Sequence, residues 1–204
     1  WLVNKNPDAL QKSALAEPED ISKKTQSSLP NFYCLPQVGQ LWGRQTEQNQ
    51  LTEWLTNPDL RLGIISGLSG CGKTSLVAQA IAAAADQFDW IDWRSLSPPI
   101  SFLQWLDECL TQAAHRPISL VESLENQLNL LLDLLRQKRC LLVFDDWQTL
   151  FTSQQFAGHY QTIHQGYQAF LKQIVETPHQ SLVLIISEIL PMGVNRWLRP
   201  GMPV

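Results

Sequence analysis

The sequence lacks the residue patterns that mark proteins stabilised by a structural metal ion or by disulfide bonds. Its four cysteines are Cys34, Cys71, Cys109 and Cys140. They form no C-x-x-C pair, and the four histidines show no ligand spacing with them. This pattern argues against a structural zinc site and against a disulfide framework. It is typical of a reduced, cytosolic protein.

Charge and hydrophobic length exclude two further classes. Lys and Arg total 15 against 19 Asp and Glu, so a net charge of −4 gives nucleic-acid binding no support. Apolar runs reach about eight residues, whereas a bilayer span needs about 20. We therefore expect no nucleic-acid partner and no membrane association, and we expect a cytoplasmic location. The chain begins at Trp1 without a basic n-region, which we interpret as a piece of a longer polypeptide.

The chain divides into a tail and one domain. Its 204 residues are enough for a single α/β domain with a core. Residues 1–36 show no sustained period, and residues 12–30 are rich in Ser, Lys, Glu and Pro. This composition predicts a flexible N-terminal linker over 1–36 and a folded domain over 37–204.

Hydrophobic periodicity within 37–204 predicts an α/β fold. Apolar runs without alternation, typical of strands buried on both faces, occur at 62–65, 140–144 and 182–186, with a weaker run at 90–93. Helical spacing is present at 45–55, 74–87, 102–114, 121–138 and 166–176. Strands that alternate with helices in this way predict a doubly wound, mostly parallel sheet with right-handed crossovers.

The segment from Gly67 to Thr74, which we call the phosphate loop, matches the pattern G-x-x-x-x-G-K-[ST] without a mismatch. An apolar strand precedes it and a helical segment follows, so backbone N–H groups and a helix N-terminus converge on one point. Lys73 is then placed to bridge β- and γ-phosphates, and the Thr74 hydroxyl to bind Mg²⁺. The candidate phosphate-binding residues are Gly67, Ser69, Gly70, Cys71, Gly72, Lys73, Thr74 and Ser75.

A second motif, Leu141-Leu142-Val143-Phe144-Asp145-Asp146, ends an apolar strand in two acids. The carboxyl end of such a strand lies beside the phosphate loop in open α/β sheets. We therefore expect Asp145 to hold Mg²⁺ with Thr74. Asp146 is the candidate catalytic residue that orients or deprotonates the attacking water, the alternative being a solvated loop acid.

These residues resemble the NB-ARC domain, a member of the STAND class of signalling P-loop NTPases. The resemblance rests on Trp42-Gly43-Arg44, residues 67–76, Trp93-Arg94-Ser95-Leu96, the segment from Arg139 to Trp147, and the segment from His159 to Ser181. It is strongest to bacterial members, especially cyanobacterial ones, in which the domain often precedes WD-repeat or TPR arrays. It implies ATP or ADP with Mg²⁺ as ligands, and Trp42, Gly43 and Arg44 on the adenine side. It also implies regulatory and effector domains of the same polypeptide, including the closing helical domains, and other proteins as partners on activation.

The sequence departs from the family at the end of its fourth core strand. NB-ARC domains usually carry Ser/Thr-Arg there, and that arginine senses the γ-phosphate. This chain has Ser187-Glu188 instead, and a carboxylate facing the γ-phosphate would repel it. Ser187 remains a candidate polar sensor. Arg94 is either a substitute cation for the phosphates or a surface residue at a strand end.

The sequence therefore favours a STAND-type switch domain that binds ATP or ADP and hydrolyses ATP slowly. One alternative is a module that holds ADP for structural reasons and hydrolyses nothing, which Glu188 favours. Another is a small-molecule kinase, but the Arg-rich lid of such kinases is missing from the sequence.

Overall fold

The computed structural model describes residues 32–33, 35–36, 43–114, 123–152 and 158–194. Its centre is a parallel sheet of five strands in the order β1-β3-β4-β5-β2. The strands are β1 (Phe32–Tyr33), β2 (Leu62–Ser66), β3 (Trp90–Ser95), β4 (Cys140–Asp145) and β5 (Leu182–Ser187). The predicted doubly wound α/β fold is confirmed.

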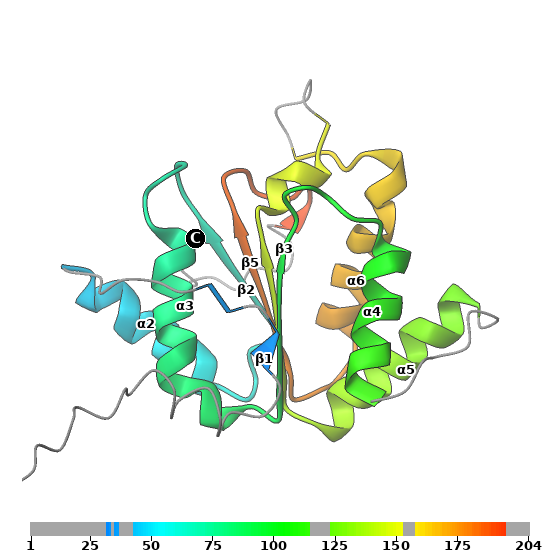
Figure 1. The fold of residues 1–204 in the computed structure, drawn as a ribbon, viewed down its shortest axis with the longest axis horizontal. Helices are drawn as coiled ribbons and strands as arrows, with labels where there is room; N and C mark the ends of the chain where they lie inside the picture. The colour runs from blue at the N-terminus through cyan, green and yellow to red at the C-terminus, as the bar shows by residue number, and fades with distance from the viewer. Residues whose placement is uncertain (1–31, 34, 37–42, 115–122, 153–157, 195–204) are drawn as a thin grey trace, which may run out of the picture.

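Helices cover both faces of this sheet (Figure 1). Helices α2 (Gln45–Thr56) and α3 (Lys73–Ala84) pack together on one face. Helices α4 (Phe102–Ala114), α5 (Leu124–Gln137) and α6 (Gln165–Glu176) lie on the other. Short 3₁₀ turns are η2 (Ala85–Gln87), η3 (Trp147–Leu150) and η4 (Thr162–His164).

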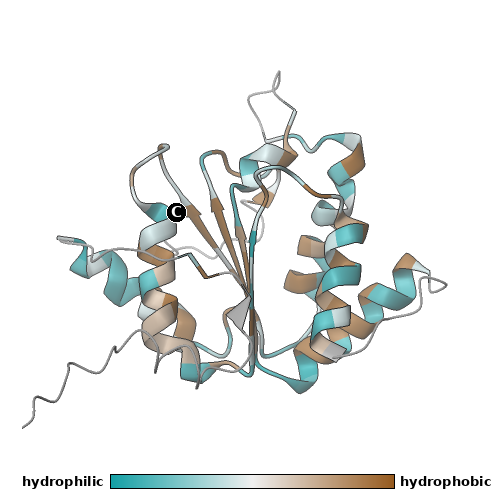
Figure 2. Cartoon of the chain, viewed as in Figure 1, coloured by the Kyte–Doolittle hydropathy of each residue, from teal (hydrophilic) through white to brown (hydrophobic). Residues whose placement is uncertain are grey.

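Alternate residues of the central strand β4 enter two different cores. Leu141 and Val143 join the core beneath α2 and α3. Cys140, Leu142 and Phe144 join the core beneath α4, α5 and α6. All of β4 is buried, which explains its continuous apolar run, because a strand covered on both faces has no solvent side to mark with polar residues. Strands β2 and β5 are largely brown between helices of mixed colour in Figure 2.

Strand β1 is a difference from the expected arrangement. Phe32 and Tyr33 pair in parallel with Ile91 and Asp92 of β3, so the sheet begins inside the segment predicted as a linker. Two residues are too few to show a strand period, and their pairing is a tertiary contact. Most of the remaining predicted linker lies outside the described residues.

The register of the strands brings three segments to one edge of the sheet. Strand β5 lies between β4 and β2, and Ser66 pairs with Ser187. The backbone N–H of Gly67 donates to the Ser187 carbonyl across 3.3 Å. Since carboxyl ends of parallel strands share one edge, the loops after β2, β4 and β5 meet there.

No helix among the described residues is long and apolar enough to cross a membrane.

Candidate functional site

The loop between β2 and α3 forms one wall of a cleft of about 330 Å³. Gly70 and Gly72 have φ values of 71° and 84°, a region that only glycine adopts readily. Gly72 is the N-cap of α3, and no side chain caps that helix. The first-turn N–H groups are therefore left for an anion, and the helix dipole adds positive potential.

Lys73 lies across the same loop. Its Nζ donates to the carbonyl oxygens of Gly67 at 2.8 Å and Leu68 at 2.9 Å. These bonds hold the ammonium group over the loop. Six of the predicted phosphate-binding residues line the cleft: Ser69, Gly70, Gly72, Lys73, Thr74 and Ser75.

The two acids after β4 form the opposite wall. Asp145 is 7% exposed, and burial raises the pKa of its carboxyl group, opposed by a hydrogen bond from the Thr74 hydroxyl. The charge of Asp146 raises the same pKa, and Lys73 lowers it. The Asp146 backbone N–H also donates to Asp145 Oδ1 at 3.0 Å. The two predicted metal ligands are thus in contact with each other.

This donor set suits Mg²⁺. Thr74 and Asp145 offer a hydroxyl and a carboxylate oxygen, the hard ligands that Mg²⁺ accepts alongside water and phosphate oxygens. Among the described residues, no group of three or more His, Cys, Asp and Glu side chains is arranged to hold a metal alone. A Mg²⁺ ion here would therefore take its remaining ligands from a nucleotide and from water.

The loop after β5 closes the cleft on its third side. Glu188, which stands where the resemblance leads us to expect an arginine, is exposed and lines the cleft. Ser187 is buried, and its Oγ donates to the Ile189 carbonyl at 2.7 Å. The lining residues thus include one cation, Lys73, and three acids, Asp145, Asp146 and Glu188.

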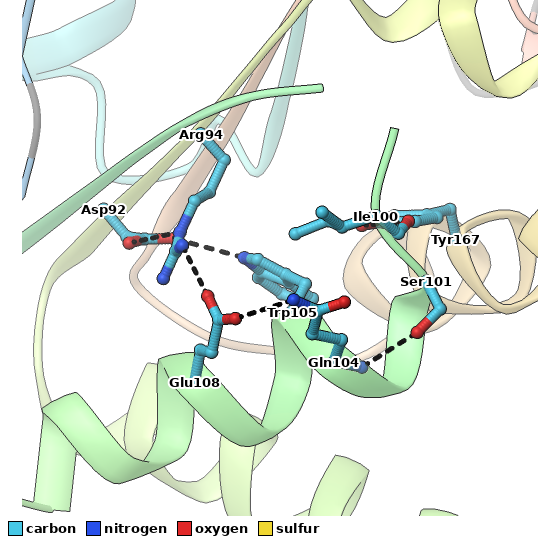
Figure 3. A network of polar contacts seen from close by, with 8 residues as sticks. All are labelled: Asp92, Arg94, Ile100, Ser101, Gln104, Trp105, Glu108 and Tyr167. Carbon is cyan, nitrogen blue, oxygen red and sulfur yellow. Dashed lines mark hydrogen bonds and ion pairs between the residues drawn. The ribbon is translucent and has the colours of Figure 1, made fainter. Parts of the chain in front are cut away.

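Arg94 does not line this cleft and belongs instead to the network of polar contacts in Figure 3. Its guanidinium pairs with Asp92 at 3.2 Å and with Glu108 of α4 at 2.7 Å. Trp105 Nε1 donates to Asp92 Oδ2 at 3.1 Å and completes the network. Arg94 is not among the residues that line the cleft, which argues against a substitute cation for the phosphates. Its side chain is 16% exposed, so the predicted surface residue is not found either.

A second pocket of about 200 Å³ lies behind the phosphate loop. Arg44, Cys71 and Lys73 line it together with Trp54 of α2 and Leu76 of α3. Gly43 is exposed with a φ of 78°, and Trp42 lies outside the described residues. Arg44 and the phosphate-loop residues Cys71 and Lys73 therefore line the same pocket.

Gln148 is a cleft residue that sequence reasoning missed. It lies on η3, two residues beyond Asp146, and contacts the loops after both β4 and β5. No motif marks a glutamine at this position. Its position in the sequence, two residues after Asp146, was the signal that could have marked it as a site residue.

Comparisons with known proteins agree with this geometry. The sequence profile of the NB-ARC domain matches residues 44–171. An uncharacterized WD repeat-containing protein of Nostoc sp. is 31% identical over an alignment of 180 residues that covers 83% of this chain. The chain spans 14% of the length of that relative. The profile covers the phosphate loop and both acids, and the chain therefore belongs to the NB-ARC family of nucleotide-binding P-loop NTPase modules within the STAND class.

Proposed function

We propose that this domain is a nucleotide-controlled switch that binds ATP or ADP with Mg²⁺ and hydrolyses ATP slowly. The observation that carries the proposal is one cleft lined by the phosphate loop, Thr74, Asp145 and Asp146. In it, loop N–H groups and Lys73 hold the phosphates, because charge-assisted hydrogen bonds to phosphate are strong. Arg44, with Trp42 and Gly43 before it, forms the adenine side.

The chemistry divides among few side chains. Thr74 and Asp145 hold Mg²⁺, which neutralises phosphate charge when bound. Asp146 orients the attacking water and accepts its proton. Slow hydrolysis follows from the charge of the cleft, because Glu188 adds a negative group at a place where a cation accelerates phosphoryl transfer.

A module that holds ADP without hydrolysis is the second candidate function, and Glu188 favours it. A carboxylate at the cleft repels the γ-phosphate, which only ATP presents. The two candidates differ in whether phosphate is released over hours in a single-turnover experiment with Mg·ATP. Release that requires Asp146 supports the switch, and bound ATP that stays intact supports the holding module.

The relative carries WD repeats, which suggests that further domains of the full polypeptide read the nucleotide state. We propose regulatory and effector domains of the same chain as the first partners of this switch, and other proteins as partners once it is activated. We propose that it acts in signalling in the cytoplasm.

Nucleotide binding is tested by Lys73→Ala. We expect calorimetry to show that Mg·ATP and Mg·ADP affinities fall at least roughly tenfold, because the cleft loses the cation that faces the phosphates. Lys172→Ala is the matched control, since Lys172 is exposed on α6. Equal affinity of wild type and Lys73→Ala, with both proteins folded by circular dichroism, would contradict the proposal.

A further inference from the structure

The side chain of Gln148 joins two walls of the cleft. Its Nε2 donates to Asp146 Oδ1 at 3.2 Å, and its Oε1 accepts from the Glu188 backbone N–H at 3.1 Å. Asp146 follows β4 and Glu188 follows β5. One amide group thus connects the candidate catalytic acid to the loop at the γ-phosphate position.

A third contact of this amide is weaker. Ser187 Oγ lies 3.3 Å from Gln148 Oε1 but 2.7 Å from the Ile189 carbonyl. A hydroxyl has one proton to donate, and the shorter distance indicates where it goes. The contacts that define the position of Gln148 are therefore those to Asp146 and Glu188.

These two contacts determine the orientation of the amide. A flipped amide would place its oxygen against the Asp146 carboxylate and its NH₂ against the Glu188 N–H, losing both hydrogen bonds. The site therefore needs a donor and an acceptor on one planar group. Glutamate supplies only the acceptor, and leucine supplies neither.

The backbone that carries Gln148 is firmly anchored. Its neighbour Trp147 is fully buried, stacks edge-on against Phe144 at 5.2 Å and donates to the Tyr160 hydroxyl at 3.1 Å. Asp146 has a φ of 60°, which is unusual for a residue with a side chain. Such a conformation persists where surrounding packing imposes it, often at a functional site. This turn directs Asp146 and Gln148 to the same cleft.

We propose that Gln148 is a positioning residue that holds the Asp146 carboxylate in its working orientation and links it to the end of β5. This role rests on the proposed function, because it requires a nucleotide in the cleft. A γ-phosphate that displaces the Glu188 loop would change the acceptor side of the amide. The donor side would then pass that change to Asp146.

The test is single-turnover hydrolysis of Mg·ATP by wild type, Gln148→Leu and Gln148→Glu, with Mg·ADP affinity measured in parallel. We expect both variants to hydrolyse roughly 10- to 100-fold more slowly, because a misplaced catalytic group costs rates of this order. Mg·ADP affinity should change less than about threefold, since phosphate binding rests on the loop and Lys73. Wild-type hydrolysis by Gln148→Glu would show that only the acceptor contact matters, and would overturn the role toward Asp146.

Two controls separate positioning from a general structural role. Gln161→Leu removes an amide from the same region, one that donates to the Phe151 carbonyl at 3.0 Å and is not a cleft residue. It should lower thermal stability without slowing single-turnover hydrolysis. In an Asp146→Asn background, Gln148→Leu should cause little further loss, because residues that act as a unit are not additive. Full additivity, or equal slowing by Gln161→Leu, would overturn the proposal.

Failure of this inference is distinguishable from failure of the proposed function. If wild type binds no nucleotide, the proposed function is wrong. If wild type binds and hydrolyses ATP and Gln148→Leu does so equally well, only the role of Gln148 is wrong. If wild type binds ATP without any hydrolysis, the holding module is supported and the positioning role falls.

Discussion

At the scale of single residues, the backbone of Asp146 combines a sterically unfavourable conformation with a place in the cleft. Its φ of 60° and ψ of 37° lie in the left-handed region. Aspartate tolerates this region better than most residues because its short polar side chain bonds locally. Among the described residues it is the one non-glycine residue with positive φ. The conformation is therefore a feature of the site rather than of the fold at large.

This conformation leads to a stability prediction. Asp146→Ala should be less stable than Asp146→Gly by about 1 kcal/mol, because a Cβ in the left-handed region costs about that much. The measurement is chemical unfolding of both variants. The exposed Asp86 in η2 is the control, since alanine should be the more stable substitution at that helical position. If alanine is equally stable at 146, the turn relaxes and is not imposed by its surroundings.

Glu188 gives a prediction about nucleotide preference. Glu188→Arg should raise the ratio of ATP affinity to ADP affinity by about tenfold, because the charge that we propose to face the γ-phosphate changes sign. Calorimetry at one salt concentration measures both affinities.

Glu176→Arg makes the same charge change at the C-terminus of α6, near the start of β5 and so at the opposite edge of the sheet. It should leave the ratio unchanged. An unchanged ratio in Glu188→Arg would mean that this side chain does not act on the nucleotide.

At the scale of secondary-structure elements, His179 and Ser181 connect several helices and strands at the edge of the sheet opposite the cleft. Ser181 Oγ accepts from the Cys140 N–H at 2.9 Å and lies 2.9 Å from the Leu135 and Lys138 carbonyl oxygens. His179 Nδ1 accepts from the Ser181 N–H, and Nε2 lies 3.0 Å from the Ile174 carbonyl. The ring must therefore be neutral with its proton on Nε2. These contacts link α5, α6, β4 and β5 at their ends.

This arrangement predicts a pH-dependent stability. Burial lowers the pKa of His179 below its ordinary value of 6.5, so the unfolded chain takes up a proton more readily than the folded one. The free energy of unfolding should fall as pH drops below about 6.5. His179→Gln should reduce this loss between about pH 7.5 and 5.5, measured by urea unfolding. Because burial also lowers the pKa of His164, part of the loss should remain in His179→Gln. An identical slope in the variant would contradict the assignment.

The elements differ in how far the sequence predicted them. Continuous apolar runs predicted β2, β4 and β5, because strands buried on both faces need no polar residues. The phosphate loop was predictable because its chemistry constrains residue types at fixed spacing. Strand β1 was not, because its two residues are defined by pairing with β3.

Two further contacts at the strand ends differ in the same way. The ion pair of Arg94 with Asp92 could have been predicted from the sequence, since residues two apart on a strand share a face. The bridge made by Gln148 was not, because it depends on where β5 ends beside β4.

At the scale of the whole molecule, nucleotide binding and stability are linked. A ligand that binds only the folded state stabilises it by about 2.7 kcal/mol at a hundred times its Kd. For a protein of this size each kcal/mol raises Tm by about 2–4 °C. Saturating Mg·ADP should therefore raise Tm by roughly 5–10 °C.

Removal of Mg²⁺ should abolish most of that increase. The cleft offers Lys73 against the carboxylates of Asp145, Asp146 and Glu188, so a metal-free nucleotide brings negative charge to a site that already has an excess of it. Mg²⁺ would reverse this balance, and Thr74 and Asp145, which contact each other, are its proposed ligands. Thermal unfolding with ADP should therefore show a shift with Mg²⁺ and little shift with a chelator. Thr74→Ala should reduce the Mg²⁺-dependent part, whereas the exposed loop residue Leu68→Ala should keep it. Equal shifts with and without Mg²⁺ in wild type would show that the acids do not face the phosphates. The metal assignment to Asp145 would then be wrong.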